Sequence, residues 1–287
     1  MTIETTGVSE GIFEYSGIPV AYLKTGSGPP LLLLHGWGNC SDVLLPLARS
    51  LSDIRTCFIP DLPGFGKTPP PREPWSVGDY ADLVRAFVHE FAGGSTDVLA
   101  HSFGGRIVLK WAARCATETG SENASKKRPQ NGASDELLKI IITGGAGMKP
   151  RRSFSYYRRR TMAVLLKTPF LILPGALKSK ALQWLRGTAI WRSLGSSDYQ
   201  KLDGVMRETF VRTVSEHLED CLPAITQEVL LLWGKEDEST PWYQAGRMAQ
   251  GLVNGALVGI DRAGHYAFLD QPDRFRRIVR AFFVPEK

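Results

Sequence analysis

A serine at position 102 stands in a string whose residue types suit nucleophilic chemistry. Val98-Leu-Ala-His-Ser-Phe-Gly-Gly105 begins with apolar residues, reaches Ser102 and ends in two glycines, and a helix-like segment follows at once. On a sharp strand-to-helix turn, the residues two before and two after the serine must be small, as Ala100 and Gly104 are. Such a turn lifts the hydroxyl above the sheet and aims a helix N-terminus at it. The string therefore predicts a serine that attacks a carbonyl carbon, although a tight turn with a capping serine would use similar residues.

A nucleophilic serine needs a base, and the base needs a carboxylate to orient it. In folds with this kind of turn, the chain order is nucleophile, acid, histidine. Two histidines follow Ser102. His265 comes just after an apolar, strand-like run at 256–260, whereas His217 lies in a polar, helix-like stretch and is interpreted as solvated. His265 is therefore the predicted base.

The predicted acid lies on the loop after the apolar run 229–233. Asp237 stands three residues past the glycine that ends this run, and Glu236 and Glu238 are its competitors. The other strand end that could supply an acid, at 140–147, contains no acidic residue. This absence favours the loop around Asp237.

A tetrahedral intermediate also needs backbone N–H donors for its oxyanion. Phe103, the residue after the nucleophile, is one expected donor. The second is expected after an earlier strand, where the apolar run at 31–34 ends in His35-Gly36, so Trp37 is the candidate. His35 precedes Ser102 in a glycine-rich turn and is interpreted as a residue that stabilises this turn.

Five strings together resemble the α/β-hydrolase superfamily, in the family's order and over nearly the whole chain. They are HGWG at 35–38, DLPGFGKT at 61–68, AHSFGG at 100–105, WGKED at 233–237 and AGHYAFLDQPDRF at 263–275. The resemblance implies a serine-nucleophile esterase type with a cap. By position it makes Ser102 the nucleophile, Asp237 the acid and His265 the base, with Trp37 and Phe103 as oxyanion donors.

The sequence departs from the family pattern at one position of the serine turn. The family's usual first glycine is Ala100 here, which is small enough for the turn. The first two strings also resemble the branch of pimeloyl-acyl-carrier-protein methyl ester esterases. A serine at position 102 excludes the branches of the family that use an aspartate nucleophile.

Strand-like and helix-like segments alternate along the chain, which predicts an α/β fold with a mostly parallel sheet covered on both faces. An opening hairpin is expected at 11–23, and apolar strands at 31–35, 56–60, 96–100, 138–143, 228–233 and 255–260. Helices are expected at 40–52, 76–92, 103–117, 241–252 and 271–283. The α/β-hydrolase core would comprise 1–147 and 227–287, with a disordered surface insertion at 117–134. A helical cap is expected at 148–226.

Positive charge is concentrated in the expected cap. Residues 137–197 contain twelve Lys or Arg and no Asp or Glu, in a chain of net charge +6. Arginine stems often cover apolar surface, but the run also suits an acidic partner or an anionic substrate. Arg158, Arg159 and Arg160 are candidate substrate-binding residues, and Trp184 and Trp191 could line a pocket in the cap. A small-molecule or carrier-linked ester is the expected ligand.

Several other functions are excluded. The Gly66-Lys-Thr68 string lacks the earlier glycine of a phosphate-binding loop, no His, Cys or carboxylate set has metal-ligand spacing, and no cofactor is expected. No nucleic-acid recognition motif accompanies the basic run. There is no transmembrane-length apolar run, and the N-terminus is polar and acidic, so a cytoplasmic protein is expected.

These features predict a serine hydrolase that cleaves carboxylic esters through an acyl-enzyme. Hydrolysis of C–C or peptide bonds uses the same three residues and stays open as an alternative. A catalytically weak ligand receptor on the same fold is a further alternative.

Overall fold

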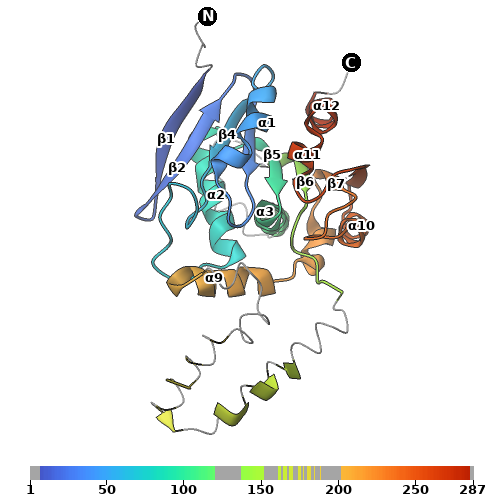
Figure 1. Cartoon of the computed structure of the whole chain (residues 1–287). Coiled ribbons are helices and arrows are strands. Elements are labelled where there is room, and N and C mark those ends of the chain that lie inside the picture. Colours follow the sequence, from blue (N-terminus) through green and yellow to red (C-terminus); the bar gives the residue numbers. More distant parts are fainter. Residues whose placement is uncertain are drawn as a thin grey trace, which may run out of the picture.

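Eight strands form one sheet in the computed structural model, which describes residues 7–119, 137–151, 202–284 and scattered positions between 161 and 188 (Figure 1). Their order across the sheet is β1-β2-β4-β3-β5-β6-β7-β8. The strands are β1 (Val8–Tyr15), β2 (Ile18–Thr25), β3 (Pro30–Leu34), β4 (Thr56–Pro60), β5 (Thr96–His101), β6 (Leu137–Thr143), β7 (Glu228–Gly234) and β8 (Gly255–Ile260).

The sheet is antiparallel at one edge and parallel elsewhere. Strand β1 pairs with β2, and β2 with β4, in antiparallel fashion. Strands β4, β3, β5, β6, β7 and β8 are parallel to one another. The predicted, mostly parallel sheet is therefore confirmed, and the carboxyl ends of its parallel strands lie at one edge, where ligands of open α/β sheets bind.

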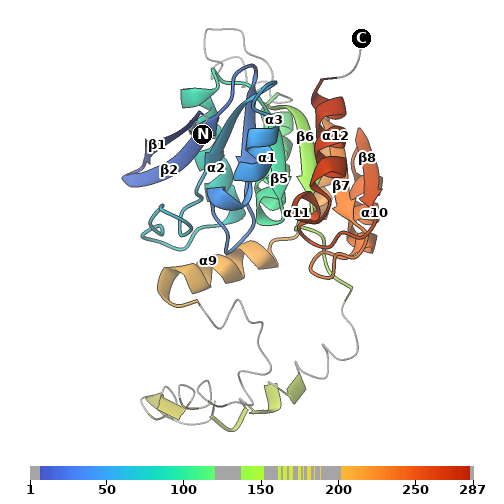
Figure 2. The same cartoon turned by 45° about the horizontal axis from the view of Figure 1, so that its top comes forward.

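Helices cover both faces of the sheet because the parallel strands are apolar on both sides. Leu32 and Leu34 belong to a buried apolar cluster on one face, which also contains residues of helices α2 (Val77–Phe91), α3 (Phe103–Thr119) and α10 (Trp242–Gly251). Leu31 and Leu33 point the other way and pack with α1 (Leu45–Ser50) and α12 (Pro272–Phe283), which share one face in Figure 2. A short helix, α11 (Ala267–Asp270), precedes α12, and a 3-10 turn, η1 (Ser41–Val43), precedes α1.

The expected elements agree with the observed ones to within a few residues, with two differences. The hairpin starts at Val8, three residues before the expected position. Helix α3 continues to Thr119, so the insertion expected at 117–134 begins inside a helix. The rest of that insertion falls in 120–136, outside the described residues.

The described part of the expected cap ends in helix α9 (Gly204–Ser215) and the 3-10 turn η2 (Glu219–Ala224). Figure 1 shows α9 lying across the carboxyl edge of the sheet, beyond α2 and α3. Its Thr209 accepts a hydrogen bond from the backbone N–H of Trp75 at 3.1 Å, and its Phe210 ring lies 5.0 Å from that of Trp37. In the part of the chain that the structure describes, no helix is long and apolar enough to cross a bilayer.

Candidate active site

Ser102 occupies a left-handed backbone conformation between β5 and α3. Its φ is +52°, a region that non-glycine residues rarely adopt. Its N–H donates to the carbonyl of Thr143 at 3.0 Å, which ties the turn to the end of β6. A Cβ at Gly104 would stand 2.6 Å from the Leu34 carbonyl oxygen, so the close approach of α3 to β3 requires glycine there. Strain at Ser102 is held in place by its neighbours, as at many active sites.

His265 and Asp237 form a hydrogen-bonded pair at the same edge of the sheet. The Nδ1 of His265 lies 2.8 Å from Oδ2 of Asp237. The Asp237 side chain is fully buried, and His265 is 16% exposed. Because Nδ1 faces the carboxylate and donates its proton, Nε2 is left with a lone pair that can accept one.

The loop after β7 holds the Asp237 carboxylate in place. Oδ1 accepts hydrogen bonds from the backbone N–H groups of Ser239 and Thr240 at 2.8 and 2.9 Å, and Oδ2 accepts one from the Thr240 hydroxyl at 2.8 Å. Burial alone would raise the pKa of Asp237, but the hydrogen bonds from His265 and Thr240 outweigh it and lower this pKa. Glu236 and Glu238, the competing acids, are exposed. Of the three candidate acids, Asp237 is therefore the one whose carboxylate is bonded to His265.

His101 links the serine turn to the predicted base. Its Nε2 donates to the backbone carbonyl of His265 at 3.1 Å, and the two rings lie 4.7 Å apart. Burial and then the nearby His265 ring lower the pKa of His101 to about 3, so its ring is neutral. On the other side, a Cβ at Gly144 would stand 2.9 Å from Nδ1 of His265, so the end of β6 packs directly on this ring. The position of His265 is therefore fixed from two sides.

Ser102 and His265 lie at the same end of the sheet but are not hydrogen-bonded to each other. Among the described residues, no hydrogen bond joins the Ser102 hydroxyl to the His265 imidazole. Hydrogen bonds between catalytic groups are often long without a ligand and tighten in the complex. Proton transfer from Ser102 to His265 therefore requires this hydrogen bond to form when a ligand binds.

Trp37 and Phe103 lie together beside the serine turn. Their rings are 5.2 Å apart with their planes at 76°, and the Trp37 ring also packs on Phe65. Phe103 is the first residue of α3, so its N–H has no acceptor within the helix. A Cβ at Gly36, just before Trp37, would be 3.1 Å from that of Ser102. Both predicted oxyanion donors thus belong to segments that border Ser102.

His35 and Asp61 connect the loops under the site. The Leu62 N–H donates to Nε2 of His35 at 3.0 Å, and Nδ1 donates to the Gly36 carbonyl at 2.8 Å. Burial lowers the pKa of His35, which keeps the ring neutral. Asp61 accepts hydrogen bonds from the N–H groups of Ser41 and Lys67 at 2.6 and 2.8 Å. The glycine-rich string around 61–68 thus wraps a carboxylate, as expected of a turn and not of a phosphate site.

The structure changes the interpretation of His217. This residue follows the end of α9 and is half-buried, not solvated. The chain turns inward here because Leu218 and Leu222 are buried in the core and the Leu218 N–H donates to the Gly147 carbonyl at 2.9 Å. His217 thereby lines a pocket of about 430 Å³.

Trp184, the one substrate-binding candidate of the cap that the structure describes, lies away from this pocket. Trp184 is 67% exposed, and its ring lies 6.4 Å from that of Phe170. It is not among the residues that line the pocket, so its place in substrate binding stays a prediction. Arg158, Arg159, Arg160 and Trp191 lie outside the described residues.

Sequence reasoning did not single out three residues that the structure places at the site. His101 and Thr240 were visible only as members of the serine turn and the acid loop, and their partners come from other segments. Arg106, four residues past Ser102, is buried in the pocket wall, although the sequence shows it only as the first charge of a helix. In the described part of the chain, no group of His, Cys, Asp and Glu side chains could hold a metal ion.

Comparison with known proteins identifies the family to which the chain belongs. The model of the α/β hydrolase fold family matches residues 29–272. The chain belongs to the α/β hydrolase family. A relative of this hydrolase is the pimeloyl-[acyl-carrier protein] methyl ester esterase of Shewanella woodyi, with 26% identity over 87% of this chain and 92% of the relative. The 2-hydroxy-6-oxo-2,4-heptadienoate hydrolase of Pseudomonas putida is 23% identical over 94% of both chains.

Solved structures share the fold of this hydrolase. A thermophilic esterase from Thermogutta terrifontis superposes with a TM-score of 0.63 and 20% identity, over 97% of this chain and 98% of that chain. The family and its esterase and hydrolase relatives place the chain among hydrolases.

Proposed function

We propose that this chain is a serine hydrolase that cleaves carboxylic esters, with Ser102 as nucleophile, His265 as base and Asp237 as acid. The observation that carries the proposal is the 2.8 Å hydrogen bond between His265 and the buried Asp237, at the sheet edge that also holds Ser102 at positive φ. This pair leaves Nε2 of His265 as an acceptor for the serine proton.

The reaction has two halves. Nε2 of His265 takes the proton of Ser102 while the serine oxygen attacks the acyl carbon, and the N–H groups of Trp37 and Phe103 hold the oxyanion. The imidazolium then gives its proton to the departing alcohol, which leaves an acyl-enzyme. Water, deprotonated by the same imidazole, attacks the acyl carbon and releases the acid and Ser102. Asp237 stays ionised throughout and stabilises the imidazolium.

A second candidate reaction is the hydrolysis of a C–C bond, because one relative is a 2-hydroxy-6-oxo-2,4-heptadienoate hydrolase. A panel of substrates separates the candidates. We expect rapid, repeated turnover of para-nitrophenyl esters and far slower cleavage of a ring-fission dienoate or a peptide. Preferential cleavage of the dienoate would favour the C–C hydrolase, and stoichiometric release of nitrophenol without turnover would favour a receptor.

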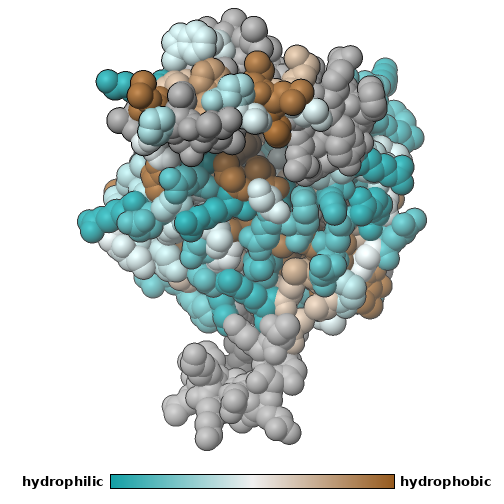
Figure 3. Space-filling view, turned by 90° about the horizontal axis from the view of Figure 1, so that it is seen from below, coloured by the Kyte–Doolittle hydropathy of each residue, from teal (hydrophilic) through white to brown (hydrophobic). Residues whose placement is uncertain are grey.

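The expected cap supplies a second part of the proposal, an ester with an apolar tail and an anionic head or carrier. In its described positions, Met162, Leu165 and Leu177 are 46%, 65% and 62% exposed, and the face that Figure 3 shows from below carries hydrophobic side chains. The surrounding sequence from 137 to 197 contains twelve basic and no acidic residues. Apolar side chains within a basic segment suit a partner that is both apolar and negatively charged. The esterase relative acts on a carrier-linked ester, which supports this by analogy only.

Reversal of the charges at arginines 158–160 tests the cap. With glutamate at all three positions, we expect KM for a carrier-linked ester to rise roughly 10-fold or more, because electrostatic attraction to the acidic carrier is lost. Added salt should weaken the same preference in the unmodified protein. A matched control reverses the exposed Arg49, Arg72 and Arg277 on the core, for the same change in net charge. An equal rise in KM for a small neutral ester would mean that the cap arginines only support packing.

A further inference from the structure

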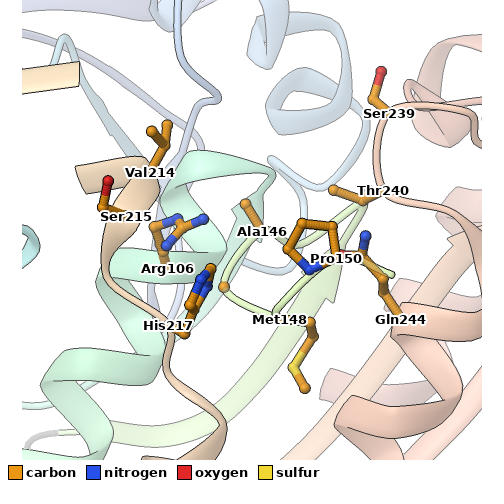
Figure 4. Close-up of a pocket in the computed structure, with 11 residues that line it drawn as sticks. Arg106, Ala146, Met148, Pro150, Val214, Ser215, His217, Ser239, Thr240 and Gln244 are labelled. Atoms are coloured by element: carbon orange, nitrogen blue, oxygen red, sulfur yellow. The ribbon is translucent and has the colours of Figure 1, made fainter. Parts of the chain in front are cut away.

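A pocket of about 430 Å³ lies at the C-terminal end of α9, beside the loop that carries Asp237. Figure 4 shows its walls: Arg106, Ser215 and His217 on one side, Gln244 and Thr240 on the other. The loop after β6 lies between these two sides. The pocket therefore joins four segments that meet at the carboxyl edge of the sheet.

Two of the pocket residues contact the catalytic groups directly. The Ala146 N–H donates to the carbonyl of Ser102 at 3.0 Å, and the Thr240 hydroxyl donates to Asp237 at 2.8 Å. Arg106 stands on α3 four residues past Ser102, about one helical turn along the axis. The walls of the pocket are therefore bonded to the two segments that carry Ser102 and Asp237.

Arg106 is a buried cation with a neutral partner. The residue is 6% exposed, and its guanidinium donates to the backbone carbonyl of Glu216. The carboxylate of Glu216 is engaged elsewhere, with Nζ of Lys110 at 2.7 Å. Burial lowers the pKa of Arg106 to about 10, although the charge of Glu216 acts in the opposite direction, so the guanidinium is protonated at neutral pH.

The other side chains of the pocket wall carry no negative charge. Among the eleven residues that line it, none is Asp or Glu, and polar groups come from serine, threonine, glutamine and histidine. Guanidinium has five N–H donors in a fixed plane, which suits bidentate hydrogen bonds to a carboxylate. Arg106 thus places one buried positive charge in a wall that has no acidic residue. Such a site suits a ligand group with a single negative charge.

We propose that this pocket is a subsite for a carboxylate on the substrate, with Arg106 as the residue that binds it. The inference rests on the proposed ester hydrolysis and narrows its substrate class to acidic esters such as monoesters of short dicarboxylic acids. A singly charged carboxylate fits better than a phosphate dianion, because Arg106 is the one lysine or arginine among the lining residues.

Matched ester pairs test the subsite. Para-nitrophenyl monoesters of succinic, glutaric and adipic acid are compared with neutral acyl esters of equal chain length, and an ester with the carboxylate on the alcohol side is added. We expect the acidic ester of each matched pair to have a higher kcat/KM than its neutral counterpart. Arg106→Gln should reduce the acidic-to-neutral ratio roughly 10- to 100-fold, because a hydrogen bond between two charged groups is lost. Arg106→Lys should retain part of the preference, since it keeps the charge but not the planar fork.

Arg114 provides the matched control. It is an arginine on the same helix, it pairs with Asp82, and it does not line the pocket. Arg114→Gln should leave the acidic-to-neutral ratio unchanged. A proportional loss on both ester classes in Arg106→Gln would overturn the subsite and show that Arg106 only anchors the Glu216 carbonyl. Stronger inhibition by inorganic phosphate than by glutarate would overturn the assignment to a carboxylate.

Binding without turnover separates this inference from the proposed function. Glutarate binding to a Ser102→Ala variant is measured by calorimetry, with and without Arg106→Gln. We expect Arg106→Gln to weaken this binding roughly 10-fold or more. If no ester is hydrolysed yet glutarate binds through Arg106, the proposed function fails and the subsite stands. If esters are hydrolysed without preference and glutarate does not bind, the subsite alone fails.

Discussion

Ser102→Ala should abolish both ester hydrolysis and covalent labelling by an organophosphate or a sulfonyl fluoride. These reagents need an activated hydroxyl, and Ser102 is held at φ +52° at the sheet edge where His265 and Asp237 are paired. We expect kcat to fall by roughly 10⁶-fold, to the level left by binding and the oxyanion donors. Mass spectrometry of the labelled protein should locate one adduct, on the peptide that contains Ser102.

Ser9 is a suitable control for this experiment. It is an exposed serine on the edge strand β1 and does not line the pocket. Ser9→Ala should therefore leave labelling and turnover in place. An adduct on another serine, with activity retained in Ser102→Ala, would contradict the assignment of the nucleophile.

Asp237→Asn should lower kcat by roughly 10⁴-fold with little change in the fold. The amide has nearly the shape of the carboxylate, but its NH₂ group can donate to Nδ1 of His265, which stabilises the tautomer that cannot accept the serine proton. The same substitution removes the negative charge that stabilises the imidazolium. Steady-state kinetics, together with circular dichroism to check folding, measure this effect.

The neighbouring acids give matched controls for Asp237. Glu236 and Glu238 are exposed on the same loop, so Glu236→Gln and Glu238→Gln should change kcat little. If kcat fell strongly in either of these variants while Asp237→Asn stayed active, the catalytic acid would be the neighbouring glutamate and not Asp237.

The strands were predictable because the apolar residues in the sequence are the ones that are buried in the sheet. Leu31 to Leu34 and the run 229–233 are apolar at every position, as expected for strands covered on both faces, and glycine follows each run closely. The position of Asp237 could be inferred for the same reason: the end of β7 is sharp, and the loop that follows is short. Most of the fold, and the choice of the loop after β7 for the acid, could therefore be predicted from regular local patterns.

The pocket and the contacts that hold His265 were not predictable, because their residues come from distant parts of the chain. The contact between His101 and the carbonyl of His265 spans 164 positions, and the one between Arg106 and Glu216 spans 110. His217 is half-buried because Leu218 and Leu222 enter the core, and the polar local sequence gives no sign of this. Contacts of this kind depend on how elements pack, and neither composition nor periodicity records that.

The parallel pairing of β6 with β7 has a consequence for how such a protein can diversify. Residues 139–142 pair in unbroken register with residues 228–231, although more than eighty residues separate the two strands in the chain. Because the two strands are parallel, the segment between them leaves at the carboxyl edge of the sheet and re-enters at the opposite, amino edge, so its length can change without shifting a strand. Evolution can therefore exchange this segment and select new substrates while the machinery beneath keeps its geometry, and a protein engineer can graft a segment from a relative at the same two junctions.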